Sequence, residues 1–142
     1  MPTRKATAVW QGGLQKGNGT FKGQTGLSGQ YNFSSRFENG AGSSPEELLA
    51  AAHASCFSMA FAARLAKAGV ADPNISVTAK VTFGPKPEGG NAVLASALAV
   101  RAQAPDGDAA KLTAVAEDAK ENCPISQALK GNVALSVEAT PS

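Results

Sequence analysis

Residues 44–61 read SPEELLAAAHASCFSMAF, and we expect the rest of the chain to pack around the helix that they form. Ser44 is a good N-cap, Pro45 stands at the first helical position, where its missing N–H costs nothing, and Glu47 completes an S-x-x-E capping box. Gly69 marks the other end. Such a helix spans roughly 35 Å, more than the width of a small domain. The sequence therefore predicts a long central helix.

This helix is apolar or small around most of its circumference, so more than one face must be covered. Large apolar residues that suit a packed core occupy its sides and back: Leu48, Phe57, Phe61 and Leu65. Mostly short side chains surround Cys56: Leu49, Ala52, His53, Met59, Ala60 and Ala63. Because short side chains let a second backbone approach closely, we expect this face to receive a partner.

Composition predicts one domain and argues against several classes of protein. The chain has 142 residues, of which 43% are hydrophobic, and this fits a single globular domain over residues 1–142. Its net charge is only +2 and its basic residues are scattered, so we expect no nucleic acid and no membrane surface as partner. The longest uninterrupted apolar run is shorter than a membrane span, and no secretory signal is recognisable. We expect a cytoplasmic protein, whose two cysteines are reduced or catalytic.

The other elements are predicted from periodicity and turn residues. Short β-type runs at residues 5–10, 17–25 and 31–34 indicate a meander before the long helix. After it we expect strands at 74–83 and 92–104, a second helix from 108, a short helix at 124–130 and a last strand at 133–137. The order β-β-β-α-β-β-α-β predicts an α+β fold with mostly antiparallel sheets around the long central helix.

Local sequence makes Cys123 the better activated of the two thiols. Cys56 lies too deep in the long helix to gain from the N-terminal dipole, and a cysteine in a buried Ala-rich helix usually behaves as a small hydrophobe. Pro124 breaks the preceding helix, so Cys123 stands at the N-cap of the next one, where orphan N–H groups favour a thiolate. Zinc shared by Cys56, Cys123 and His53 is an alternative, although a buried helical histidine more often belongs to the core.

Four motifs occur in order along the chain: Arg36-Phe37-Glu38, Pro45-Glu46-Glu47-Leu48, residues 51–59 (AAHASCFSM) and Cys123-Pro124-Ile125-Ser126. Together they closely resemble the OsmC (osmotically inducible protein C) branch of the OsmC/Ohr family, over essentially the whole chain. The resemblance implies a peroxiredoxin-type enzyme of the oxidative stress response, which reduces organic hydroperoxides to alcohols. It also implies an intertwined homodimer with active sites at the subunit interface.

The resemblance assigns roles to four residues. Cys56 is the peroxidatic thiolate, Cys123 is the resolving thiol that forms a redox-active disulfide with it, and Arg36 and Glu46 prepare Cys56. In such a cycle a thiolate attacks peroxide, becomes a sulfenic acid and condenses with a second thiol, so we expect no metal and no organic cofactor. Arg36 would stabilise the thiolate while Glu46 holds the guanidinium in a bidentate pair, and Glu47 would be occupied with the helix cap.

Four aromatic residues are candidates for an apolar hydroperoxide pocket, although core packing would also explain them: Tyr31, Phe33, Phe37 and Phe57. The resemblance further implies a thiol reductant, a lipoylated protein or dihydrolipoamide rather than thioredoxin. Two other classes stay open. One is a small-molecule or protein-binding member of the fold with idle cysteines, and the other is a metal-dependent hydrolase using His53 and Cys56.

Overall fold

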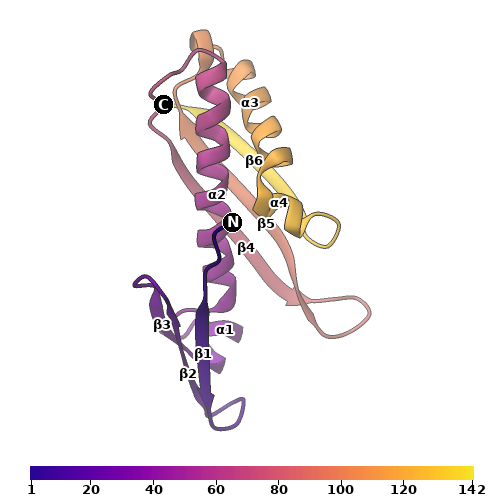
Figure 1. Cartoon of the computed structure of the whole chain (residues 1–142). Helices are drawn as coiled ribbons and strands as arrows, with labels where there is room; N and C mark the ends of the chain where they lie inside the picture. The colour runs from indigo at the N-terminus through magenta and orange to yellow at the C-terminus, as the bar shows by residue number, and fades with distance from the viewer. The chain divides into compact units, whose positions relative to one another are not determined.

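Helix α2 runs unbroken from Pro45 to Lys67 in the computed structural model, which describes residues Met1–Ser142 (Figure 1). Ser44 caps it as predicted, because the Ser44 hydroxyl accepts a 3.1 Å hydrogen bond from the Glu47 N–H. The second half of the predicted capping box is wrong, since the Glu47 carboxylate accepts from the Ser43 hydroxyl instead. Gly69 ends the helix with φ +99°, a left-handed conformation that glycine adopts without strain.

The chain divides into two compact units, Met1–Leu48 and Leu49–Ser142, with the boundary inside α2. That residues 1–142 form one domain therefore remains a prediction, and each unit is described separately below. The observed elements form an α+β fold with two separate three-stranded sheets and the long helix, as the sequence predicted.

The first unit contains the predicted meander, formed by β1 (Ala6–Gln11), β2 (Asn18–Gly23) and β3 (Ser28–Tyr31), all antiparallel. The prediction that the third strand continues through Phe33 is wrong, because Phe33–Phe37 forms a short helix, α1. Asn32 causes the change: its side chain accepts from the Ser35 N–H, and the Ser35 hydroxyl accepts from the Asn32 N–H, both at 2.8 Å. This reciprocal cap ends the strand and starts a helix.

The second unit contains the other sheet, in which β5 (Asn91–Ala102) lies between β4 (Ser76–Pro85) and β6 (Ala134–Pro141). The β4–β5 pair is antiparallel and the β5–β6 pair is parallel. A crossover joins the parallel strands through the short 3-10 helix η1 (Pro105–Gly107), α3 (Ala109–Asn122) and α4 (Pro124–Leu129). One parallel pair among four leaves the sheets mostly antiparallel, as expected.

The core of the second unit lies between the sheet, α3 and one stripe of α2. Phe57, Phe61 and Leu65 recur every four residues along α2, and all three are completely buried. They meet alternate residues of β5 and the inner face of α3: Leu98, Val100, Ala102, Leu112, Ala116 and Ala119. The predicted back of the long helix is therefore core, and it fixes the direction in which the neighbouring Cys56 and His53 point.

One side of α2 is exposed in this chain, at Ala51, Ser55, Met59 and Ala63. The helix is long enough to cross a membrane, and its most apolar stretch has a mean hydropathy of 1.4. This was not predicted from the sequence, because polar residues interrupt the apolar runs. One stripe of this helix, Phe57, Phe61 and Leu65, is completely buried in the protein core, and a core helix passes the same test of length and composition. On the uncovered side Met59 is 76% exposed among small residues, so this face is unpartnered within one chain.

Candidate functional site

The structure brings Cys56 and Cys123 together in the second unit. Cys56 lies on α2 and is partly exposed, whereas Cys123 is completely buried. Cys123 ends α3, where its N–H donates to the Ala119 carbonyl at 2.9 Å, and the following Pro124 begins α4. Both thiols are free, and Cys56 packs against the core cluster that contains Cys123, close enough for each thiol to shift the pKa of the other. The two residues can therefore form a disulfide between two elements that are distant in sequence.

The local environment favours ionisation of Cys123 over Cys56. Burial raises the pKa of Cys56, and its donation to Cys123 raises this pKa further. Burial acts on Cys123 in the same direction, but hydrogen bonds from the Ser126 N–H, the Cys56 thiol and the Ser126 hydroxyl outweigh it and lower the pKa. This agrees with the local interpretation of the sequence, and Cys56 needs a further positive charge to ionise first.

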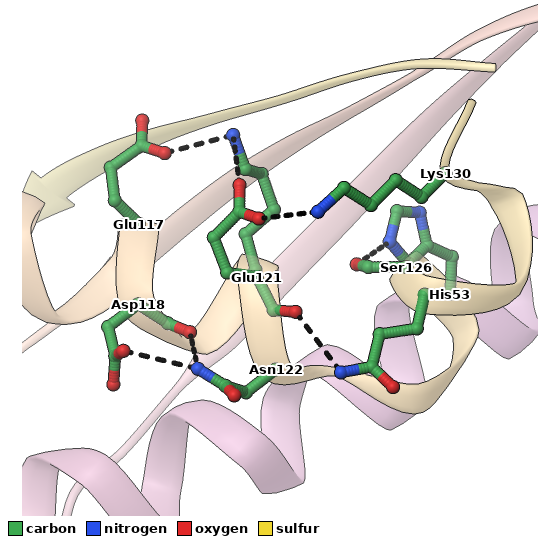
Figure 2. A network of polar contacts seen from close by, with 9 residues as sticks. His53, Glu117, Asp118, Glu121, Asn122, Ser126 and Lys130 are labelled. Carbon is green, nitrogen blue, oxygen red and sulfur yellow. Dashed lines mark hydrogen bonds and ion pairs between the residues drawn. The ribbon is translucent and has the colours of Figure 1, made fainter.

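His53, one turn before Cys56, is completely buried and hydrogen-bonded through both ring nitrogens. Its Nδ1 lies 2.6 Å from the Ser96 hydroxyl of β5, and its Nε2 lies 2.8 Å from the Ser126 hydroxyl of α4. Figure 2 shows the imidazole directed at Ser126. Both ring nitrogens are engaged in these hydrogen bonds, so a metal bound by His53 would have to displace one of the two serine hydroxyls. Neither serine stood out in the sequence.

Burial lowers the pKa of His53 from 6.5, so the unfolded chain binds this proton more readily than the folded one. The free energy of unfolding should therefore fall as the pH drops below about 6.5, by at most about 1.4 kcal/mol per pH unit, and this stability is fully present above that pH. Chemical denaturation of the wild type and His53→Gln over a pH series measures it. The difference between the two curves should decline on acidification; parallel curves would contradict the assignment.

Arg36 and Glu46 form a bidentate ion pair in the first unit, as expected. The Arg36 Nε and Nη2 each donate to one Glu46 carboxylate oxygen at 3.1 Å. Helix α1 carries Arg36 and the first turn of α2 carries Glu46, whose side chain is only 10% exposed against 36% for Arg36. A buried carboxylate that satisfies two guanidinium N–H groups fixes the orientation of the arginine. The central carbon of the Arg36 guanidinium, Cζ, also lies 5.6 Å from the ring centre of Phe37.

An apolar pocket of about 250 Å³ opens beside Arg36, within the first unit. Three of the four predicted aromatic residues line it, Tyr31, Phe33 and Phe37, with Phe33 and Phe37 stacked at 4.7 Å. Trp10 and Leu14 also line it, and the sequence did not single them out. Trp10 and Tyr31 pack over Gly19, where a Cβ atom would lie within 2.7 Å of both rings.

Phe57 is not part of this pocket. It is completely buried in the core of the second unit and stacks on Phe61 at 5.4 Å between ring centres. The structure thus groups the predicted residues as a cysteine pair in one unit and an arginine, its carboxylate and three aromatic rings in the other.

Comparisons with known proteins agree on one family. Residues 38–138 match the family described as OsmC-like protein. The chain is 39% identical over 134 residues to peroxiredoxin OsmC of Escherichia coli, covering 93% of each chain. Among solved structures, an organic hydroperoxide resistance protein from Elizabethkingia anophelis matches with a TM-score of 0.79 at 26% identity, over 100% of this chain and 98% of that one. The organic hydroperoxide resistance protein OhrB of Bacillus subtilis gives 0.74 at 25%, over 96% and 98%.

Proposed function

The chain belongs to the OsmC-like family, and from this membership we propose that it is a thiol peroxidase that reduces organic hydroperoxides to alcohols. The relatives named peroxiredoxin and organic hydroperoxide resistance protein support a role in hydroperoxide detoxification. The observation that carries the proposal is the proximity of Cys56 and Cys123, two free thiols brought together from different elements.

The cycle begins at Cys56. Its thiolate attacks one peroxide oxygen, the O–O bond breaks, the alkoxide leaves and takes up a proton, and Cys56 becomes a sulfenic acid. The Cys123 sulfur then attacks the Cys56 sulfur, the S–O bond breaks, and the hydroxide leaves as water with the proton of Cys123. An external dithiol reduces the Cys56–Cys123 disulfide. For this reductant we propose a lipoylated protein or dihydrolipoamide, and the cycle uses no metal and no organic cofactor.

Arg36 supplies the positive charge that the local environment of Cys56 lacks. Its N–H groups stabilise the Cys56 thiolate and the developing alkoxide, while Glu46 holds the guanidinium in place through the two 3.1 Å hydrogen bonds. The pocket formed by Trp10, Leu14, Tyr31, Phe33 and Phe37 beside Arg36 would receive the apolar part of the hydroperoxide.

A homodimer follows from two features of α2. Its uncovered face of small residues around the exposed Met59 suits close contact with a second copy of the chain. The same helix carries Glu46 and Cys56 ten residues apart without a break, which corresponds to about 15 Å along the helix axis. An Arg36 side chain that is bound to Glu46 cannot span this distance to Cys56 of the same chain. We therefore assign Arg36 and Glu46 of one chain to Cys56 of the other. The proposed location is the cytoplasm.

A stoichiometric reaction tests the function. Reduced protein mixed with excess cumene hydroperoxide should lose both thiols of each chain and yield one equivalent of cumyl alcohol before reductant is added, with an unchanged circular dichroism spectrum. Thiol titration and chromatography of the alcohol give the two numbers. If both thiols persist and the hydroperoxide is recovered, the chain is a binding member of the fold with idle cysteines, and the proposal fails.

A further inference from the structure

The proposed cycle gives no task to His53, the buried histidine of the second unit. His53 and Ser96 are 0% exposed, and Ser126 is 2% exposed. The imidazole is hydrogen-bonded to the Ser96 hydroxyl at 2.6 Å and to the Ser126 hydroxyl at 2.8 Å. Because the ring belongs to α2 and its two partners belong to β5 and α4, it joins three elements that are distant in sequence.

Helix α4 depends on its neighbours for its position. It has only six residues, and a helix this short is not stable without tertiary contacts. Ser126 is its one buried residue, and Ile125 is partly buried against the core. Gln127 makes the other side-chain hydrogen bond of α4, a long one of 3.5 Å from the Gln127 amide to the Glu121 carbonyl of α3. The bond to His53 is therefore the buried polar link between α4 and the long helix.

The charged groups near α4 do not supply such a link to α2. Lys120 and Glu121 of α3, with Lys130 after α4, line a pocket that also includes Ser126. Glu121 forms ion pairs with both lysines (Figure 2). These pairs hold the corner between α3 and α4 together from outside, and they leave its polar attachment to α2 to His53.

The His53–Ser126 bond lies one helical turn from the thiol pair. His53 stands three residues before Cys56 on α2, and Ser126 stands three residues after Cys123, the residue between α3 and α4. Residues three apart lie on the same face of a helix. The hydrogen bond and the two thiols thus form adjacent links between α2 and the same corner of the chain, so fixing one link restricts the other.

We propose that His53 is a positioning residue for the resolving step: through its bond to Ser126 it holds α4 where Cys123 faces Cys56. The role rests on the proposed peroxidase cycle. In that step the S–S bond forms, the S–O bond of the Cys56 sulfenic acid breaks, and the proton of Cys123 leaves with hydroxide as water. His53 gives and takes no proton; it restricts the motion of α4, and a thiol held in place attacks faster and forms a more stable disulfide.

The position of α4 is tested without peroxide. The protein is equilibrated with mixtures of reduced and oxidised dithiothreitol, and the disulfide is measured by alkylation and mass spectrometry. Ser126→Ala should lower the equilibrium constant for the Cys56–Cys123 disulfide about tenfold, because a buried hydrogen bond that restrains Cys123 is lost. The sign is informative: if the hydroxyl acted only by stabilising the Cys123 thiolate, its loss would destabilise the reduced form and favour the disulfide instead.

Ser96→Ala is the matched control, because it removes a hydroxyl from the same imidazole without touching α4. It should cost a similar free energy of unfolding in urea and leave the disulfide equilibrium near that of the wild type. His53→Gln should also stay near the wild type, since its terminal amide can still reach Ser126. An unchanged equilibrium in Ser126→Ala, or an equal shift in Ser96→Ala, overturns the positioning role.

Single-turnover kinetics provide a second readout. Ser126→Ala should consume hydroperoxide with little change and then form the disulfide about tenfold more slowly, with sulfenic acid accumulating. Disulfide formation at the wild-type rate in this variant would contradict the proposal. Failure of the wild type to reduce hydroperoxide would instead overturn the proposed function, and the equilibrium with dithiothreitol would still decide whether His53 positions α4.

Discussion

Cys56→Ser is expected to abolish hydroperoxide reduction, whereas Cys123→Ser should still consume about one equivalent of hydroperoxide per chain in a single turnover. In the proposed cycle Cys56 becomes the sulfenic acid, and Cys123 enters afterwards to convert it into a disulfide. Without Cys123 the sulfenic acid should persist or oxidise further. Rapid-mixing measurements of peroxide loss, with mass spectrometry of Cys56, follow both events.

This expectation runs against the local electrostatics of one chain, which makes it a demanding test. The pKa of Cys56 is raised and that of Cys123 is lowered, so the local environment within one chain favours ionisation of Cys123 rather than Cys56. If Cys123→Ser is inert in the burst and Cys56→Ser retains it, the two roles are reversed. The argument that Arg36 must act on Cys56 would then fail with them.

Glu46→Gln should slow hydroperoxide reduction by several orders of magnitude more than Glu47→Gln does. Glu46 presents one carboxylate oxygen to each of two Arg36 N–H groups, whereas glutamine is neutral and would turn its own NH2 donor toward one of them. Glu47 is the matched control one residue along the same helix, since it accepts from the Ser43 hydroxyl at the surface and its loss costs about 0.3–1 kcal/mol of stability. Steady-state assays and thermal unfolding of both variants separate rate from stability; equal kinetic losses would contradict the role of Glu46.

A mixture of two inactive variants tests whether the site is shared between chains. Refolding Glu46→Gln together with Cys56→Ser should restore roughly a quarter of the wild-type activity, because half of the dimers are mixed and each mixed dimer has one intact site. Native mass spectrometry confirms that the mixed dimers form. If they form and remain inactive, Glu46 serves the Cys56 of its own chain.

The long helix could be predicted because its signals are local. Ser44, Pro45 and Gly69 mark its ends within a few residues, and the recurrence of Phe57, Phe61 and Leu65 predicts its buried stripe. The prediction of the third strand was wrong at Phe33. The alternation of apolar residues continues there, but the reciprocal hydrogen bonds of Asn32 and Ser35 start a helix. Similarly, the Glu47 carboxylate was expected to accept from the Ser44 N–H, but it accepts from the Ser43 hydroxyl.

The Arg36–Glu46 pair was expected from the family resemblance, because each residue alone was equally well explained as a surface charge or a helix-terminus carboxylate. The pair has the expected bidentate geometry. Nothing in the sequence indicated that Ser96 and Ser126 would meet His53, since they lie 43 and 73 residues away and serine is common. Phe57 could not be assigned to pocket or core until the burial of each face of α2 was known.

The parallel pairing of β5 with β6 also sets an order for protein synthesis. The hairpin of β4 and β5 joins neighbouring segments and can form as soon as both leave the ribosome. Strand β6 begins only at Ala134, and it completes the sheet against which α3 packs. We therefore expect Cys123 to reach its place beside Cys56 only after β6 has left the ribosome, so until then the nascent chain carries two separated thiols that cannot yet resolve each other.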